Sequence, residues 1–152
     1  MSYGIGIKAL IPKDLMIVPA LAINNVKTSV EEVVMQDYIS ANLPAIDLND
    51  TRQFYEFLGF QCDHQSQQWM ILSKDSLIIE FFHHPQLNPK ESWFSVCLRT
   101  KIMHDLFHYW QNLDWTAFPD AKITEIQYLG EVDMFSVMDP NGSLIRCIQL
   151  DR

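Results

Sequence analysis

A strand, a helix and further strands are predicted twice along this chain, and this repeated order constrains the fold more than any other feature. The two segments cover about residues 40–84 and 92–150, with a loop containing prolines and asparagines between them. A repeat of about fifty to sixty residues is typical of two copies of one supersecondary unit. The pattern therefore predicts an α+β fold built from two βαβββ units, although the two halves share little literal sequence similarity.

Turn and capping residues set the expected element boundaries. A helix over residues 50–58 is expected to have Asn49 or Asp50 as its N-cap and to end before Gly59. The turn Asp139–Gly142 is expected to join the last two strands. A second helix is predicted at about 102–111, and strands at 42–46, 68–73, 77–83, 93–99, 122–128, 132–138 and 143–150.

Charge and cysteine content exclude several classes of protein. The chain has 152 residues, enough for one domain with a sizeable core, and its 11 basic and 19 acidic side chains give a formal charge of −8. A nucleic-acid-binding domain usually carries a basic patch, so no nucleic-acid partner is expected. Three sparse cysteines indicate reduced thiols in a cytoplasmic protein, and no apolar run is long enough to cross a membrane.

Five segments of the chain together form a specific pattern. The opening signature is residues 46–60 (IDLNDTRQFYEFLGF), and the closing one is residues 139–145 (DPNGSLI). Between them lie residues 69–72 (WMIL), 77–85 (LIIEFFHHP) and 92–99 (SWFSVCLR). Together these segments resemble the bleomycin-resistance proteins of the glyoxalase/bleomycin-resistance/dioxygenase (vicinal oxygen chelate) superfamily, and the resemblance implies a glyoxalase-like curved mixed sheet. The match is weakest over 112–129, where this chain is shorter, and Tyr128 stands near the position of a family tryptophan.

The resemblance also locates the start of the domain. Met35 lies seven residues before Asn42-Leu-Pro, as the initiating methionine of the family does. Residues 31–34 (EEVV) can be encoded by a purine-rich ribosome-binding sequence. We therefore interpret residues 1–34 as an N-terminal extension of translated leader sequence, and 35–152 as the ancestral domain.

The metal site of the superfamily's enzymes is expected to be lost. Those enzymes hold a divalent metal with one ligand from each of four strands, and the resemblance places these positions at Ser40, Glu80, Trp93 and Arg146. An indole offers no lone pair to a metal, and a guanidinium is a permanent cation. Only Glu80 remains a ligand, so we expect no metal, no cofactor and no catalysis.

A second possible metal site is the pair His104 and His108, one helical turn apart. No glutamate stands at the spacing of a His-Glu-x-x-His motif, so a solvated helix face is favoured over metal binding.

The resemblance implies that the protein binds and sequesters bleomycin-type glycopeptide antibiotics in an aromatic-lined cleft, as a homodimer with an exchanged N-terminal strand. Glu80 either contacts the ligand or forms an ion pair with Arg146. Two alternatives stay open: binding of a different small cationic or aromatic ligand, and a metal-dependent lyase or dioxygenase of the same fold. The expected ligand-binding residues are Trp69, Glu80, Phe82, His84, Trp93, Ser95, Tyr128 and Arg146.

Overall fold

The computed structural model describes residues 37–150, within the compact unit Asp37–Arg152. The predictions for the extension 1–34 and for the start at Met35 lie outside the described residues. No helix in the described part of the chain is long and apolar enough to cross a membrane.

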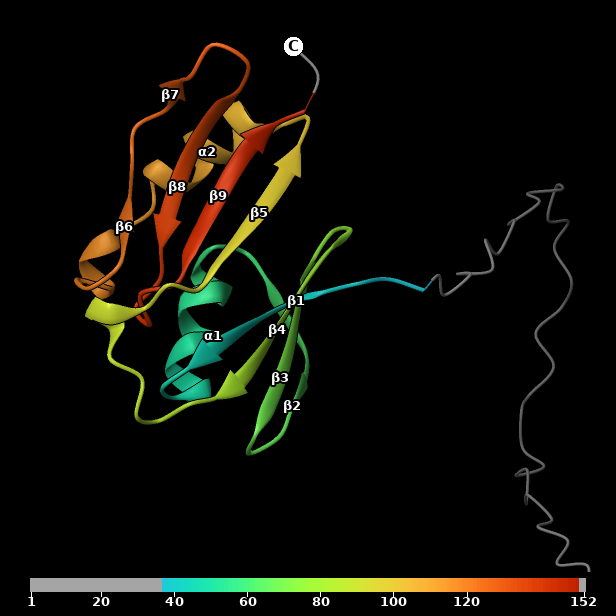
Figure 1. Cartoon of the computed structure of the whole chain (residues 1–152), viewed down its shortest axis with the longest axis vertical. Coiled ribbons are helices and arrows are strands. Elements are labelled where there is room, and N and C mark those ends of the chain that lie inside the picture. Colours follow the sequence, from blue (N-terminus) through green and yellow to red (C-terminus); the bar gives the residue numbers. More distant parts are fainter. Residues whose placement is uncertain (1–36, 151–152) are drawn as a thin grey trace, which may run out of the picture. The chain divides into compact units, whose positions relative to one another are not determined.

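The first half folds as strand, helix and three strands, and its sheet has the order β1-β4-β3-β2. Strand β1 is parallel to β4, whereas β3 is antiparallel to both of its neighbours. Helix α1 packs on one face of this sheet (Figure 1). The elements are β1 (Ala41–Ala45), α1 (Leu48–Phe57), β2 (Gln61–Gln65), β3 (Trp69–Lys74) and β4 (Leu77–His83).

The second half repeats this arrangement in a separate sheet with the order β5-β9-β8-β6, and β7 also pairs with β8. Strand β5 is parallel to β9, so in both halves the first strand lies beside the last. The elements are β5 (Ser95–Thr100), α2 (Met103–Gln111), β6 (Lys122–Ile123), β7 (Gln127–Tyr128), β8 (Asp133–Met138) and β9 (Leu144–Gln149), with 3₁₀ helices at Pro89–Glu91 and Trp115–Ala117. The predicted α+β fold with two related units is confirmed. The strands form two sheets, and each sheet contains both parallel and antiparallel pairs.

Several predicted element boundaries are wrong, and one strand was not predicted. Helix α1 is capped by Asp47, whose carboxylate accepts hydrogen bonds from the amides of Asn49 and Asp50 at 2.7 and 3.0 Å. Strand β2 was not predicted because its sequence, QCDHQ, has no apolar alternation. The single strand expected over 122–128 is divided into β6 and β7, because residues 124–126 are not in strand conformation, although the Thr124 amide still donates to the carbonyl of Ser136 at 2.9 Å.

The core of the first half explains why one sheet face remains open. Strands alternate their side chains, and α1 buries Phe54, Tyr55 and Leu58 completely against the sheet. The sheet residues on that face, such as Met70 and Phe81, are also fully buried. Their neighbours along β3 and β4 therefore point to the opposite face, which no helix of the described chain covers.

The turn between β8 and β9 joins the two halves. Its Asn141 side chain accepts a hydrogen bond from the amide of Ile46 and donates one to the hydroxyl of Thr51, both at 3.0 Å. The turn is tight at Gly142, which has φ +77°, and a Cβ there would lie 2.1 Å from the backbone carbonyl oxygen of Pro89. The predicted turn is confirmed, and it holds the N-terminus of α1 against the second half.

Candidate functional site

Four of the eight expected ligand-binding residues lie on or beside the uncovered face of the first sheet, which we call the open face. Trp69 begins β3, and Glu80 and Phe82 lie two residues apart on β4. The pairing of Trp69 with Phe82 places the indole and the phenyl ring on neighbouring strands. His84 follows directly after β4, and its amide donates to the carbonyl of Ala45 at 2.7 Å.

Both carboxylate oxygens of Glu80 accept hydrogen bonds from side chains of the first half. The hydroxyl of Ser40 donates to Oε1 at 2.5 Å, and Nε1 of the Trp69 indole donates to Oε2 at 2.9 Å. Among the described residues of one chain, Arg146 does not pair with Glu80, and its guanidinium donates to the Ser95 hydroxyl on the other sheet at 3.0 Å. Glu80 is thus part of the first sheet's own hydrogen-bond network.

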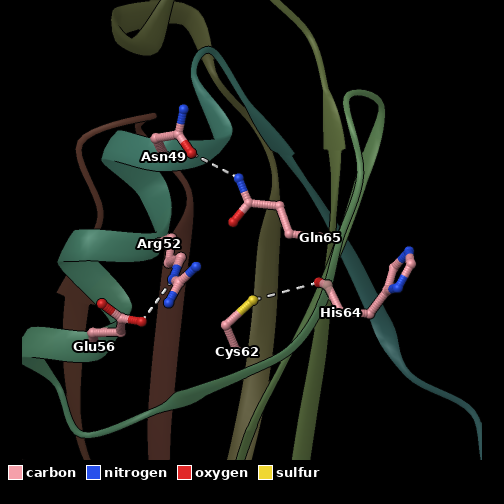
Figure 2. Close-up of polar contacts among 6 residues, drawn as sticks. All are labelled: Asn49, Arg52, Glu56, Cys62, His64 and Gln65. Carbon is pink, nitrogen blue, oxygen red and sulfur yellow. Dashed lines mark hydrogen bonds and ion pairs between the residues drawn. The ribbon is translucent and has the colours of Figure 1, made fainter.

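His64 also belongs to this face, and sequence reasoning missed it. Its imidazole lies against the Trp69 indole, with ring centroids 5.2 Å apart and an interplanar angle of 53°. Figure 2 shows the His64 ring on the side of β2 away from α1, whereas Gln65 and Cys62 point toward the helix. A register shift between Cys62 and His64 produces this orientation, and a sequence with no strand prediction here gives no sign of it.

Aromatic rings continue from Trp69 toward the loop that joins the halves. The Phe82 ring stacks on His84 with centroids 6.1 Å apart, and it meets the edge of Phe94 at 6.0 Å. Trp69 and Phe94 are each 38% exposed. This combination of partly exposed rings and a few polar groups is typical of small-molecule sites, because flat ligands stack on exposed ring faces.

The opposite side of β2 faces α1 and carries polar contacts. Figure 2 shows Asn49 of α1 joined to Gln65 of β2, where the Gln65 side-chain amide donates to Oδ1 of Asn49 at 2.8 Å. The Arg52 guanidinium forms an ion pair with Glu56 at 2.6 Å within the helix itself. The Asn49–Gln65 hydrogen bond therefore links α1 to β2 on the side of the sheet opposite the open face.

The other four expected residues lie on the second half. Ser95 and Arg146 are on paired strands β5 and β9, and they bond to each other as described above. Trp93 was expected within a strand, but β5 begins only at Ser95, and the Trp93 side chain is 95% exposed. Tyr128 lies in the short strand β7 and is 70% exposed. Within residues 37–150, no hydrogen bond or ion pair connects these four residues to the open face.

The residues at the superfamily's four metal positions do not fit a metal ion. Ser40 and Glu80 are in contact, but the Ser40 hydroxyl donates to the carboxylate that a metal would need. Trp93 and Arg146 supply only donor groups. No cluster of three or more histidine, cysteine, aspartate or glutamate side chains in the described part of the chain is arranged to hold a metal, and His108 instead contacts Gln111.

Among the described carboxyl groups, Asp139 has a clearly raised pKa, and its role is structural. Burial raises the pKa of Asp139 from 3.8 to about 6, against the opposing effect of hydrogen bonds from Ser143, Tyr55 and Asn141. Burial likewise raises the pKa of the Cys147 thiol to about 12. Both groups lie in the core of the second half, so neither is available to a ligand on the open face.

Comparison with known proteins decides the family. No family model matches the chain. A curated bleomycin resistance protein from Klebsiella pneumoniae is 37% identical over 119 residues, which cover 76% of this chain and 94% of that protein. The chain belongs to the bleomycin resistance protein family.

Solved structures agree with this assignment. A bleomycin-binding protein crystallised with bleomycin is 34% identical and superimposes with a TM-score of 0.70, covering 76% of this chain and 100% of that one. The bleomycin resistance determinant encoded on transposon Tn5 is 34% identical, with a TM-score of 0.69, covering 77% and 100%. A lactoylglutathione lyase from Agrobacterium tumefaciens shares only 12% identity, but its TM-score of 0.54 over 76% of this chain and 94% of that one confirms the glyoxalase-like fold.

Proposed function

We propose that this protein confers resistance by binding bleomycin-type antibiotics stoichiometrically, without chemistry. The observation that carries the proposal is the open face, where the Trp69 indole is partly exposed and held by Glu80 beside His64 and Phe82. Bleomycins carry flat heteroaromatic rings and a cationic tail, and such rings stack on exposed aromatic side chains. The formal charge of −8 favours the approach of a cation.

The second sheet supplies the remaining part of the proposed ligand site. Ser95, Tyr128 and Arg146 lie on the second sheet and Trp93 shortly precedes it, and all four are exposed. A homodimer would bring the open face of one subunit to the second sheet of its partner, and an exchanged strand β1 would keep the pairing with β4 and the Ser40–Glu80 hydrogen bond across the two subunits. We propose this assembly in the cytoplasm, with the ligand between the two surfaces.

Two other functions correspond to the alternatives left open by the sequence. A different aromatic or cationic ligand is favoured by the exposed Tyr128 at the family's tryptophan position. A metal-dependent lyase or dioxygenase has only the fold in its favour, because the donor groups at the four metal positions do not fit.

The test is titration of the purified protein with metal-free bleomycin and with copper(II)-bleomycin, followed by tryptophan fluorescence and calorimetry. We expect saturable quenching at about one drug molecule per chain. Trp69→Ala is expected to weaken binding by about 1–3 kcal/mol, because a stacking partner is removed. Association is expected to slow with rising salt, since opposite charges attract over about 10 Å at 0.1 M ionic strength.

Tyr109→Ala provides the matched control. Tyr109 is a 50% exposed aromatic residue on α2, outside the proposed site, and its removal is expected to leave the affinity within about twofold of that of the wild type. Equal affinity of the Trp69→Ala variant and the wild type would remove Trp69 from the site. Failure of both drug forms to bind, with thermal stabilisation by another ligand, would favour the first alternative.

A further inference from the structure

Glu80 has the chemistry of a ligand-binding group, but its geometry gives it another role. Its two carboxylate oxygens are both engaged within the first sheet, one by the Ser40 hydroxyl and one by the Trp69 indole N–H. A cation approaching the open face would therefore meet a carboxylate whose hydrogen bonds already hold neighbouring side chains. Glu80 pairs with Ile71 of β3 on one side and with Asn42 of β1 on the other. Its strand β4 therefore lies between the strand that carries Trp69 and the strand that Ser40 immediately precedes.

We infer that Glu80 is a positioning residue that fixes the orientation of the Trp69 ring for drug stacking, with Ser40 as its support. This inference rests on the proposed function. It reassigns two of the superfamily's metal positions, Ser40 and Glu80, to a hydrogen-bonded clamp on an aromatic side chain. The clamp acts through hydrogen bonds and not through the negative charge.

Orientation matters for Trp69 because little else restrains its ring. The side chain is 38% exposed, and its described ring contact is the tilted one with His64, 5.2 Å away. An indole that turns about its side-chain torsions must be ordered when a ligand binds, and this ordering lowers the affinity by up to about tenfold. The Glu80 hydrogen bond supplies this order before the drug arrives.

Two substitutions of Glu80 separate hydrogen bonding from charge. Glu80→Ala removes both acceptors. Glu80→Gln removes the charge but retains the contacts, since the amide oxygen can accept from the Trp69 N–H and the amide nitrogen can donate to the Ser40 oxygen. Glu125→Ala, at an exposed loop glutamate distant in sequence from the open face, controls for the loss of one negative charge.

The first measurement needs no drug and follows the indole N–H groups by ¹H–¹⁵N spectroscopy and hydrogen exchange. The other three tryptophans provide internal references, because Trp110 and Trp115 donate to backbone carbonyls at 2.9 and 2.8 Å whereas the Trp93 side chain is 95% exposed. The Trp69 signal is assigned by its loss in Trp69→Phe. We expect its N–H to exchange at least about tenfold faster in Glu80→Ala, as expected when a hydrogen bond is lost. Glu80→Gln is expected to retain the protection.

The second measurement is bleomycin affinity in a double-mutant cycle. Glu80→Ala is expected to weaken binding about tenfold and Glu80→Gln less than about threefold, because only the former frees the ring. In a Trp69→Phe background, Glu80→Ala is expected to cost less than about twofold, since phenylalanine has no N–H to hold. Glu125→Ala is expected to stay within about twofold of the wild type.

Specific results would overturn the inference. Equal losses in Glu80→Ala and Glu80→Gln would assign the role to the charge, and therefore to direct contact with the drug cation. An undiminished effect of Glu80→Ala in the Trp69→Phe background would separate Glu80 from Trp69. An unprotected Trp69 N–H in the wild type would refute the clamp, whereas a protected N–H in a protein that binds no bleomycin would refute only the proposed function.

Discussion

Replacing Asp139 by asparagine is expected to change how stability depends on pH. Asp139 is completely buried, and its carboxylate accepts hydrogen bonds from the amides of Asn141 and Ser143 at 3.0 and 2.8 Å and from the Tyr55 hydroxyl at 3.1 Å. The side chain of asparagine is of nearly the same size and keeps an oxygen for the two amides, while its NH₂ group can donate to the tyrosine oxygen. Asp139→Asn therefore removes the ionisation with little change in packing.

The magnitude follows from the raised pKa. Asp139 has a pKa of about 6 in the folded protein, against 3.8 for the ordinary group. Well below pH 3.8 the carboxyl is protonated in both the folded and the unfolded chain, and this contribution to stability is fully present. Between pH 3.8 and 6 the unfolded carboxyl is mostly ionised while the folded one mostly retains its proton, so the free energy of unfolding falls as pH rises. The loss is about 3 kcal/mol, at about 1.4 kcal/mol for each pKa unit.

Urea unfolding of the wild type and of Asp139→Asn at pH 4, 5, 6 and 7.5 measures this effect. Other titrating groups cancel in the difference between the two proteins. The variant is expected to gain about 2 kcal/mol relative to the wild type between pH 4 and 7.5, because part of the effect is already present at pH 4. A difference that does not change with pH would refute the reasoning. A gain of the wild type relative to the variant would show that the three hydrogen bonds outweigh burial.

Three further predictions concern a turn, the thiols and the domain boundary. Gly142→Ala is expected to lower the free energy of unfolding by more than about 2 kcal/mol in the urea assay, because its Cβ would clash with the backbone carbonyl of Pro89. Gly130→Ala is the control: φ is also positive there (+75°), but a Cβ would meet no atom within 4 Å, so the expected loss is only about 1 kcal/mol. A thiol reagent is expected to label exposed Cys97 in the native protein and Cys147 only after unfolding, since burial raises the pKa of the Cys147 thiol to about 12; native labelling of Cys147 would contradict its burial. A chain that starts at Met35 is expected to fold and to bind bleomycin as the full chain does, with a melting temperature lower by no more than a few degrees, and aggregation of the shortened chain would contradict the boundary.

The order of elements was predictable because both halves contain long patterned segments. The apolar residues of β3, β4 and α1 recur at the spacing of their structures, and Gly59, with φ +90°, ends the first helix as expected. The N-cap was misplaced because Asp47, Asn49 and Asp50 are all capping residues within one turn. The choice among them depends on where β1 ends, which the sequence does not specify.

The resemblance selected Trp69, Glu80 and Phe82 as ligand-binding residues, and all three lie on or beside the open face, but it gave no sign of the contacts they make. The partner of Glu80 depended on which strands share a sheet, and Arg146 lies in the other one. His64 was missed because a polar edge strand with a register shift has no periodic signal. The environment predicted for Trp93 was also wrong, because the start of a strand is poorly predicted from sequence and β5 begins two residues later than expected.

The turn between β8 and β9 also affects the order in which the chain can fold. Its hydrogen bonds to Ile46, Thr51 and Tyr55 span sequence separations of 95, 90 and 84 residues. Contacts of such high contact order form slowly, because a long loop must close before they form. During synthesis the first half emerges from the ribosome before this turn does, so its α1 remains without these partners. Completion of the N-terminal half must therefore wait until nearly the whole chain has been translated.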